Sequence, residues 1–215
     1  MGDLPGFDPT LILWLNLVGT FVFGLSGALA AVRARLDVFG VVALAAVVGL
    51  AGGITRDILI GTPPATFRDW RYLAAAGAAG LVAFFGGPLL ERVSRGILTF
   101  DAMGLALFCV TGASKASDFG LGIAPAVILG AITGIGGGML RDLILREVPI
   151  VLRRELYATP ALLGAGVVVA AHKTGHLGPA FPVLGAGLCF AIRMLGVRYG
   201  IDAPIAPSER RRPPS

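Results

Sequence analysis

The chain has 215 residues, of which 55% are hydrophobic and only 14% are charged, and its mean hydropathy is +0.82. Soluble domains carry about 25% charged residues, so the composition excludes a soluble protein and indicates an integral membrane protein. The net charge of +5 does not indicate a nucleic-acid-binding surface, because the charges lie in loops between apolar runs. These runs fill nearly the whole length, so residues 1–200 are expected to form a single transmembrane domain.

Seven apolar runs are long enough, or nearly long enough, to cross a bilayer. In chain order they are roughly Leu11–Val32, Val38–Ile60, Leu73–Leu90, Ile97–Ala113, Ile123–Leu145, Leu156–Ala171 and Pro179–Val197. The first run is not typical of a signal peptide, because it is too long and acidic residues precede it. The sequence therefore predicts an all-α membrane protein with seven transmembrane helices.

The second and fifth runs contain the same unusual phrase. Gly52-Gly53-Ile54-Thr55-Arg56-Asp57 returns 85 residues later as Gly137-Gly138-Met139-Leu140-Arg141-Asp142. The same offset pairs further glycine, proline and tyrosine residues: Gly19 with Gly104, Pro64 with Pro149 and Tyr72 with Tyr157. Such matches at one constant offset indicate an internal duplication. We assign residues 11–90 to repeat 1, residues 97–172 to repeat 2 and residues 179–199 to a seventh helix without a partner.

Each repeat holds three spans, so the second repeat enters the membrane from the opposite side. The predicted architecture is thus an inverted 3+3 repeat plus a seventh helix. With the N-terminus outside, the inner loops and tail hold eleven arginines, against four basic residues outside. This excess favours an outer N-terminus and a cytoplasmic C-terminus in the cell inner (plasma) membrane. The inner arginines are Arg33, Arg35, Arg92, Arg95, Arg146, Arg153, Arg154, Arg198, Arg210, Arg211 and Arg212.

Adjacent glycines stand at the start of the repeated phrase, and in the second copy a third glycine directly precedes it. They are Gly52 and Gly53 in the first copy and Gly136, Gly137 and Gly138 in the second. Each glycine costs about 1 kcal/mol of helix propensity, and close helix packing needs only one glycine per turn. We therefore expect a kink or an unwound turn at both places. Carbonyls exposed there could face a cation where they line a cavity.

The charged pairs Arg56-Asp57 and Arg141-Asp142 lie one turn beyond these glycines. Because the repeats are inverted, the two pairs approach opposite membrane faces. They could form a charged vestibule at each end of a path, since ionisable residues within spans are costly and often functional. Alternatively, each pair is an interfacial salt bridge that braces a helix end.

Other polar residues within the runs have two interpretations each. Asp101 could attract cations near an inner membrane edge or cap a helix after Thr99-Phe100. Ser26 and Thr111 occupy equivalent positions and could line a polar path, or bond their own helix carbonyls. Lys115 could gate cation flow at an outer helix end or serve as an interfacial anchor.

The pattern of reactive residues does not favour an enzyme. The sequence presents no nucleophile–base pair, paired acids, zinc spacing or nucleotide-binding loop, so we expect no catalytic residue, metal or cofactor. Residues 201–215 are rich in Pro and Arg and are expected to be a disordered cytoplasmic tail. The tail could contact anionic membrane lipid or act only as a topology signal.

Two three-helix units, each with Gly-Gly-x-x-Arg-Asp in its second helix, plus a lone seventh helix resemble the prokaryotic trimeric intracellular cation (TRIC) channels. The match extends over about Leu11 to Tyr199. The resemblance implies a homotrimer with a separate pore in each subunit, formed by kinked second and fifth helices. It also implies conduction of monovalent cations, chiefly potassium. The alternative is a transporter of the same architecture for a small solute such as glycine.

One departure from the family limits what can be carried over. Animal members have a Lys-Glu-Val triplet in the fourth helix that is linked to lipid binding and gating. The corresponding segment here is Lys115-Ala116-Ser117, which lacks the acidic residue. Regulation by inositol lipids is therefore not expected, and Lys115 remains only a candidate gating residue.

Overall fold

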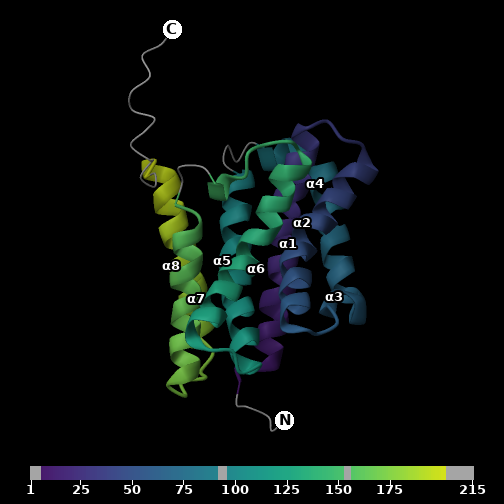
Figure 1. Ribbon diagram of the computed structural model, residues 1–215. Coiled ribbons are helices and arrows are strands. Elements are labelled where there is room, and N and C mark those ends of the chain that lie inside the picture. Colours follow the sequence, from purple (N-terminus) through teal and green to yellow (C-terminus); the bar gives the residue numbers. More distant parts are fainter. Residues whose placement is uncertain (1–5, 92–95, 153–155, 202–215) are drawn as a thin grey trace.

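The computed structural model describes residues 6–91, 96–152 and 156–201. Seven long helices lie side by side in a bundle (Figure 1). They are α1 (Pro9–Arg33), α2 (Val38–Ile60), α4 (Trp70–Glu91), α5 (Gly96–Asp118), α6 (Ile123–Ile144), α7 (Ala158–Lys173) and α8 (Ala180–Tyr199). Each corresponds to one predicted run, which confirms the all-α fold. Five of them, α1, α2, α5, α6 and α8, are apolar and long enough within the described residues to span a membrane.

Two short elements follow the helices that carry the repeated phrase. The helix α3 (Ala65–Arg68) comes after α2, and the 3-10 turn η1 (Ile150–Leu152) comes after α6. They begin 85 residues apart, and a proline directly precedes each one. Proline fixes its own backbone angle and cannot continue a helix, so it starts a new turn at the same place in both copies. The apolar pattern did not predict either element.

The helix α5 is longer than its apolar run, and this changes the position of Asp101. Small and polar residues, including Ser114 and Ser117, continue the helix to Asp118 and are buried there. Ser117 bonds the carbonyl of Ala113, so its hydroxyl is satisfied within the helix. Because α5 begins at Gly96, Asp101 lies inside the helix, and the interpretation of Asp101 as an N-cap was wrong.

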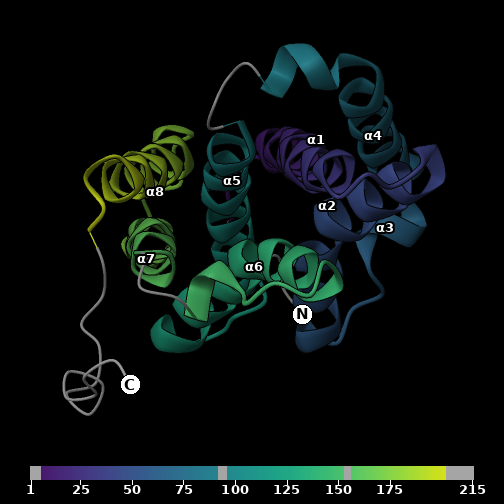
Figure 2. The same cartoon turned by 90° about the horizontal axis from the view of Figure 1, so that it is seen from above.

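The two repeats run in opposite directions through the bundle. The helices α1 and α5 are equivalent, yet α1 ascends and α5 descends in Figure 1, and the start of α1 and the end of α8 lie at opposite faces. Within each repeat the three helices pack on one another, and α8 packs on α5 and α7 (Figure 2). We call the face with residue 6 and loop 61–64 the N-terminal face. The opposite face, where α8 ends, is the C-terminal face.

The centre of the bundle is the crossing of α1 and α5. These helices have the most buried apolar stretches among the five candidate spans, 72% and 67% against 33–44% for the other three. The rings of Phe23 and Phe108 lie 5.7 Å apart between their centroids. A Cβ on Gly19 would lie 2.8 Å from the Phe108 ring, and a Cβ on Gly104 would likewise collide with Phe23. Each phenylalanine thus fills the space that a glycine of the other repeat leaves open.

Candidate functional site

The helices α2 and α6 cross in direct backbone contact at Gly52 and Gly137. A Cβ on Gly52 would collide with the carbonyl oxygen of Thr133, and a Cβ on Gly137 would collide with that of Val48. The two contacts are equivalent, because each partner is 85 residues from its counterpart. Both glycines are therefore required by the close approach of two backbones.

The helix is continuous through both glycine clusters. α2 extends over Val38–Ile60 and α6 over Ile123–Ile144 without interruption, so neither cluster contains the unwound turn that was one of two expectations. A Cβ on Gly53 would meet only the Arg56 guanidinium, at 3.9 Å, whereas one on Gly138 would lie 2.6 Å from the Tyr157 hydroxyl. Gly136 lies against the backbone of Gly52. The five glycines thus have different surroundings.

Near the N-terminal face, Arg56 and Asp57 form the centre of a buried polar cluster. The Arg56 Nε donates to Asp57 Oδ1 at 2.7 Å, and Arg56 Nη1 donates to the Asn16 side chain at 3.2 Å. Lys115 Nζ donates to the same Asp57 oxygen at 2.8 Å. The other Asp57 oxygen accepts the backbone N–H of Ala65 at 2.9 Å, which fixes the start of α3.

Near the C-terminal face, Arg141 and Asp142 make the equivalent contacts. Arg141 Nε donates to Asp142 at 2.9 Å, and Asp142 accepts the backbone N–H of Ile150 at the start of η1. Arg141 Nη1 donates to Asp101 at 2.7 Å and to the hydroxyl of Ser26 at 2.6 Å. We call Arg141, Asp101, Asp142 and Ser26 the Arg141 cluster.

These contacts bear on both interpretations of the charged pairs. Arg56 and Arg141 are each only 3% exposed, so neither side chain extends to the surface as an interfacial anchor would. Each aspartate does hold the loop that follows its helix, because it accepts a backbone N–H eight residues on. Each buried pair thus has a hydrogen bond to the element that follows its helix, and a buried ion pair needs such additional hydrogen bonds.

The two clusters differ in charge. Arg56, Lys115 and Asp57 together carry one net positive charge, while Arg141, Asp101 and Asp142 together carry one net negative charge. Two exchanges cause the difference: Asn16 stands where repeat 2 has Asp101, and Lys115 has Ala30 as its counterpart. Asp101 is fully buried beside Arg141, so it does not lie open to cations as one interpretation expected.

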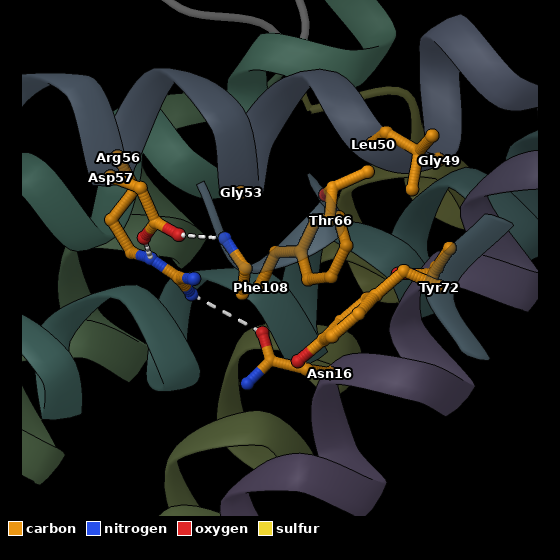
Figure 3. Close-up of a pocket in the computed structure, with 11 residues that line it drawn as sticks. Asn16, Gly49, Leu50, Gly53, Arg56, Asp57, Thr66, Tyr72 and Phe108 are labelled. Carbon is orange, nitrogen blue, oxygen red and sulfur yellow. Dashed lines mark hydrogen bonds and ion pairs between the residues drawn. The ribbon is translucent and has the colours of Figure 1, made fainter. Parts of the chain in front are cut away.

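A cavity leads from the N-terminal face to the Arg56 side chain. Its outer part has a volume of ≈ 260 Å³ and is lined by Lys115 and Asp118 as well as by apolar residues of α1. A second, inner part of ≈ 10 Å³, room for about one water, is lined by Gly53 and Phe108 (Figure 3). The two parts share Asn16, Arg56, Ala65 and Tyr72. We call the combined space the Arg56 vestibule.

The vestibule ends at the centre of the bundle. Phe108 and Gly49 line its inner end, and Phe108 packs there against Phe23. The backbone contact at Gly52 lies beside the same ring, since a Cβ on Gly52 would be 3.3 Å from Phe108. An aromatic pair and a tight helix crossing therefore close the space between the vestibule and the other half of the molecule.

The remaining predicted residues fall in different places. Ser26 joins the Arg141 cluster and donates to the carbonyl of Ile97 at 3.3 Å. Thr111, its counterpart, bonds the Phe108 carbonyl of its own helix at 3.4 Å and lines neither part of the vestibule. Lys115 lines the outer part of the vestibule while it pairs with Asp57.

Sequence reasoning missed three side chains at these sites. Arg193 on α8 is fully buried, and its guanidinium lies 4.8 Å from the centre of the Tyr157 ring. Tyr72 lines the vestibule at the position equivalent to Tyr157. An arginine inside the seventh apolar run was the signal for Arg193, because a charge there is costly without a partner. The paired tyrosines were visible in the 85-residue offset, but nothing in the sequence placed them beside the arginines.

Comparison with known families gives two matches within this one chain. A family model described as "Glycine transporter" matches residues 13–88 and again residues 98–173. The second match begins and ends 85 residues after the first, so the same family pattern occurs once in each repeat. This agrees with the duplication that the repeated phrase indicates.

Relatives and solved structures extend over nearly the whole chain. A Streptomyces coelicolor protein, "UPF0126 membrane protein SCO4104", is 52% identical and covers 94% of both chains. The Escherichia coli K12 "UPF0126 inner membrane protein YadS" is 35% identical over 90% of this chain and 95% of its own. A crystal structure of the TRIC trimeric intracellular cation channel orthologue from Rhodobacter sphaeroides is 37% identical, with a TM-score of 0.85 over 89% of this chain and all of that one.

Proposed function

The chain belongs to the membrane-protein family whose model is described as "Glycine transporter" and to the prokaryotic branch of the TRIC channels, and on that premise we propose that it is a channel for monovalent cations, chiefly potassium. Each subunit would contain its own path between the two inverted repeats. The single observation that carries this proposal is the Arg56 vestibule, a space with polar groups from several helices that lies between one face and the centre of the bundle.

The proposed path continues from the vestibule through the crossing of α2 and α6 to the Arg141 cluster. Gly53 offers an open helix side next to Arg56, while Gly52 and Gly137 set how closely the two helices approach. We propose that conduction requires α2 and α6 to move apart there, with a kink at the adjacent glycines as the hinge. The charged pairs then brace the ends of both helices. Neither proposed role involves catalysis.

A bilayer recording tests the proposal directly. Purified protein in planar bilayers under a KCl gradient should give unitary currents that reverse near the potassium equilibrium potential. Gly53→Leu should reduce the current strongly, because the new side chain would enter the vestibule. Gly77→Leu is the matched control, since a Cβ on Gly77 in α4 would meet nothing within 4 Å. Wild-type currents from Gly53→Leu would remove the vestibule from the path, and no current at any voltage would refute the channel.

We base the proposed oligomeric state and membrane location on the same relatives. The Rhodobacter sphaeroides structure is of a trimeric channel and YadS is an inner membrane protein, so we propose a homotrimer in the cell inner membrane. The N-terminal face would be the outer one. Native mass spectrometry of the purified protein should give a mass of three chains. A monomer that still conducts would contradict the need for a trimer.

A small-solute transporter is the second candidate, because the family model carries the description "Glycine transporter" and the vestibule is lined by a net positive cluster of Arg56, Lys115 and Asp57. A passive cation path would gain nothing from that charge. Proteoliposomes containing the protein should then accumulate labelled glycine in a saturable manner, without unitary currents. Unitary currents together with background glycine uptake would decide for the channel.

A further inference from the structure

The Arg56 vestibule contains more positive than negative charge around Asp57. Arg56 and Lys115 both donate to one oxygen of Asp57, at 2.7 and 2.8 Å, so their nitrogens are close neighbours around a single anionic group. Arg68, which is exposed at the end of α3, adds positive potential at Lys115. One carboxylate thus serves two cations that line the same space.

Both cations have hydrogen-bond donors left over for a ligand. Lys115 has three N–H groups and uses one of them on Asp57. Arg56 uses Nε on Asp57 and Nη1 on Asn16, and within the part of the chain that the structure describes its Nη2 has no hydrogen-bond partner. A Cβ on Gly53, which lines the inner part of the vestibule, would lie 3.9 Å from that nitrogen. Because Arg56 is only 3% exposed, an open donor beside a cavity favours an anion there.

The second carboxylate of the vestibule, Asp118, has a different partner. Its side chain lines the outer part, is 35% exposed and contacts His172 Nε2 at 3.2 Å. Among the described residues no ion pair joins it to Lys115, although it lies only three positions further along α5. Water screens a partly exposed carboxylate, so Asp118 leaves the surplus charge on Arg56 and Lys115 in place.

Repeat 2 shows how the same scaffold balances its arginine. There Arg141 Nη1 donates to Asp101 at 2.7 Å, and Arg141 Nη2 lies 2.8 Å from Asp142. Asn16 is the counterpart of Asp101, and Ala30 stands where repeat 1 has the vestibule lysine. Repeat 1 therefore lacks one carboxylate and has one additional amine at the equivalent place. A shared structural role for the repeated phrase does not account for these two exchanges.

The cavity has the size and the access that a small anion needs. Its outer part of ≈ 260 Å³ has room for roughly eight waters at about 30 Å³ each, so an anion can enter together with water. Arg56 lines both the outer and the inner part. An anion of halide size beside Arg56 can therefore reach the unused donors of both cations. The single surplus charge matches an anion with one negative charge.

We propose that the Arg56 vestibule binds one small monovalent anion, chloride or bromide, between Arg56 and Lys115. The anion accepts the N–H groups that Asp57 and Asn16 leave unused, and it supplies the negative charge that Asp101 supplies in repeat 2. The vestibule is then neutral and repels a potassium ion less strongly. The site rests on the cavity and its charges, so it goes beyond the proposed channel and does not depend on it.

Thermal unfolding of the purified protein in detergent tests the site in solution. Gluconate is replaced stepwise by chloride at a constant sodium concentration. The unfolding midpoint should rise saturably with chloride, because a ligand that binds only the folded state stabilises that state. Bromide should have the same effect. A midpoint that does not depend on chloride, as expected if Lys115 is neutral in the folded protein, would overturn the proposal.

Variants separate a specific site from a general effect of salt. Asn16→Asp installs the carboxylate of repeat 2, so in gluconate it should unfold at a higher temperature than the parent, and chloride should not raise its midpoint further. Lys115→Ala removes the surplus charge and should weaken chloride binding at least about tenfold. It provides the same test if Asn16→Asp does not fold, and size-exclusion chromatography verifies folding. Lys173→Ala removes a charge from an exposed position outside the cavity and should respond like the parent. An equal response of all variants to chloride would refute the site.

Anomalous diffraction from crystals grown in sodium bromide locates the ion. A peak is expected within hydrogen-bonding distance of Lys115 Nζ and Arg56 Nη2, and crystals of Asn16→Asp should lack it. Bromide peaks at other places only would refute this position for the anion.

Bilayer recordings distinguish a failure of the site from a failure of the channel. A protein that chloride stabilises but that gives no potassium current would refute the channel and leave the site. Potassium currents from a protein whose midpoint does not depend on chloride would refute the site and leave the channel.

Discussion

Gly52 and Gly53 are adjacent residues with opposite surroundings. Gly52→Ala should destabilise the protein by about 1–3 kcal/mol, because the new Cβ collides with the Thr133 carbonyl and forces α2 and α6 apart. Gly53→Ala should be neutral or stabilising by about 0.5–1 kcal/mol, since its Cβ would make only an ordinary contact with the Arg56 guanidinium at 3.9 Å and Ala favours a helix. Thermal unfolding of the two variants in detergent measures the difference. Equal midpoints for both variants would contradict the close crossing at Gly52.

Asp101 in the Arg141 cluster and Asn16, its equivalent in repeat 1, give a second comparison between the repeats. Asp101→Ala removes a 2.7 Å ion pair and leaves Arg141 with fewer compensating partners in the interior. We expect a loss of about 3–5 kcal/mol in the free energy of unfolding. Asn16→Ala removes only a neutral acceptor for Arg56 and should cost about 1–3 kcal/mol. Denaturant titration measures the free energy of unfolding of both variants. A larger loss for Asn16→Ala than for Asp101→Ala would show that Arg56 depends more on its partner than Arg141 does.

At the residue scale, the doubled phrase singled out four charged residues and four glycines, and Gly136 directly precedes its second copy. Their functional roles stay predictions. The phrase alone could not tell a broken helix from a close helix crossing. Gly52 differs from Gly53 in lying against the Thr133 carbonyl, and that carbonyl belongs to another helix. Arg193 was missed because its partners, the ring of Tyr157 and the carbonyl of Leu156, lie on a different element.

The crossing of α1 and α5 contains the aromatic pair that closes the inner end of the vestibule. Phe108→Ala should increase open probability or conductance, because it enlarges the space between Gly49 and Phe23 at that end. Single-channel recording measures the effect. The substitution also removes core packing worth about 3–5 kcal/mol, so Phe108→Leu is the second variant. Phe84→Ala, which alters an aromatic pair within α4, is the control and should leave conduction unchanged.

At the element scale, the lengths of the apolar runs predicted the number of long helices but not the residues at which those helices end. The fourth run stopped at Ala113 because the next residues are small and polar, yet these continue α5 to Asp118 within the bundle. That added turn carries Lys115 and Asp118 into the vestibule. The hydropathy pattern also could not predict α3 and η1, since each is only a few residues long.

The orientation of the whole molecule is open to a labelling experiment. Thr174→Cys on the N-terminal face should react with a membrane-impermeant maleimide in intact cells. Ala34→Cys on the C-terminal face should react only after permeabilisation, because the excess of arginine predicts that this face is cytoplasmic. Both positions are exposed in the structure. The native Cys109 and Cys189 are buried and provide the unlabelled background. Labelling of Ala34→Cys in intact cells would reverse the proposed orientation.

The central contact between the repeats has a consequence for how such a protein arose. Gly19 on Phe108 and Gly104 on Phe23 are one contact made twice about a two-fold axis. Two copies of a single three-helix chain can form an isologous interface of this kind, provided that they insert in opposite orientations. The middle of the molecule has the symmetry that an antiparallel homodimer of three-helix chains would have. Joining two such chains into one would fix the two orientations and let each half differ in charge, as the Arg56 and Arg141 clusters do.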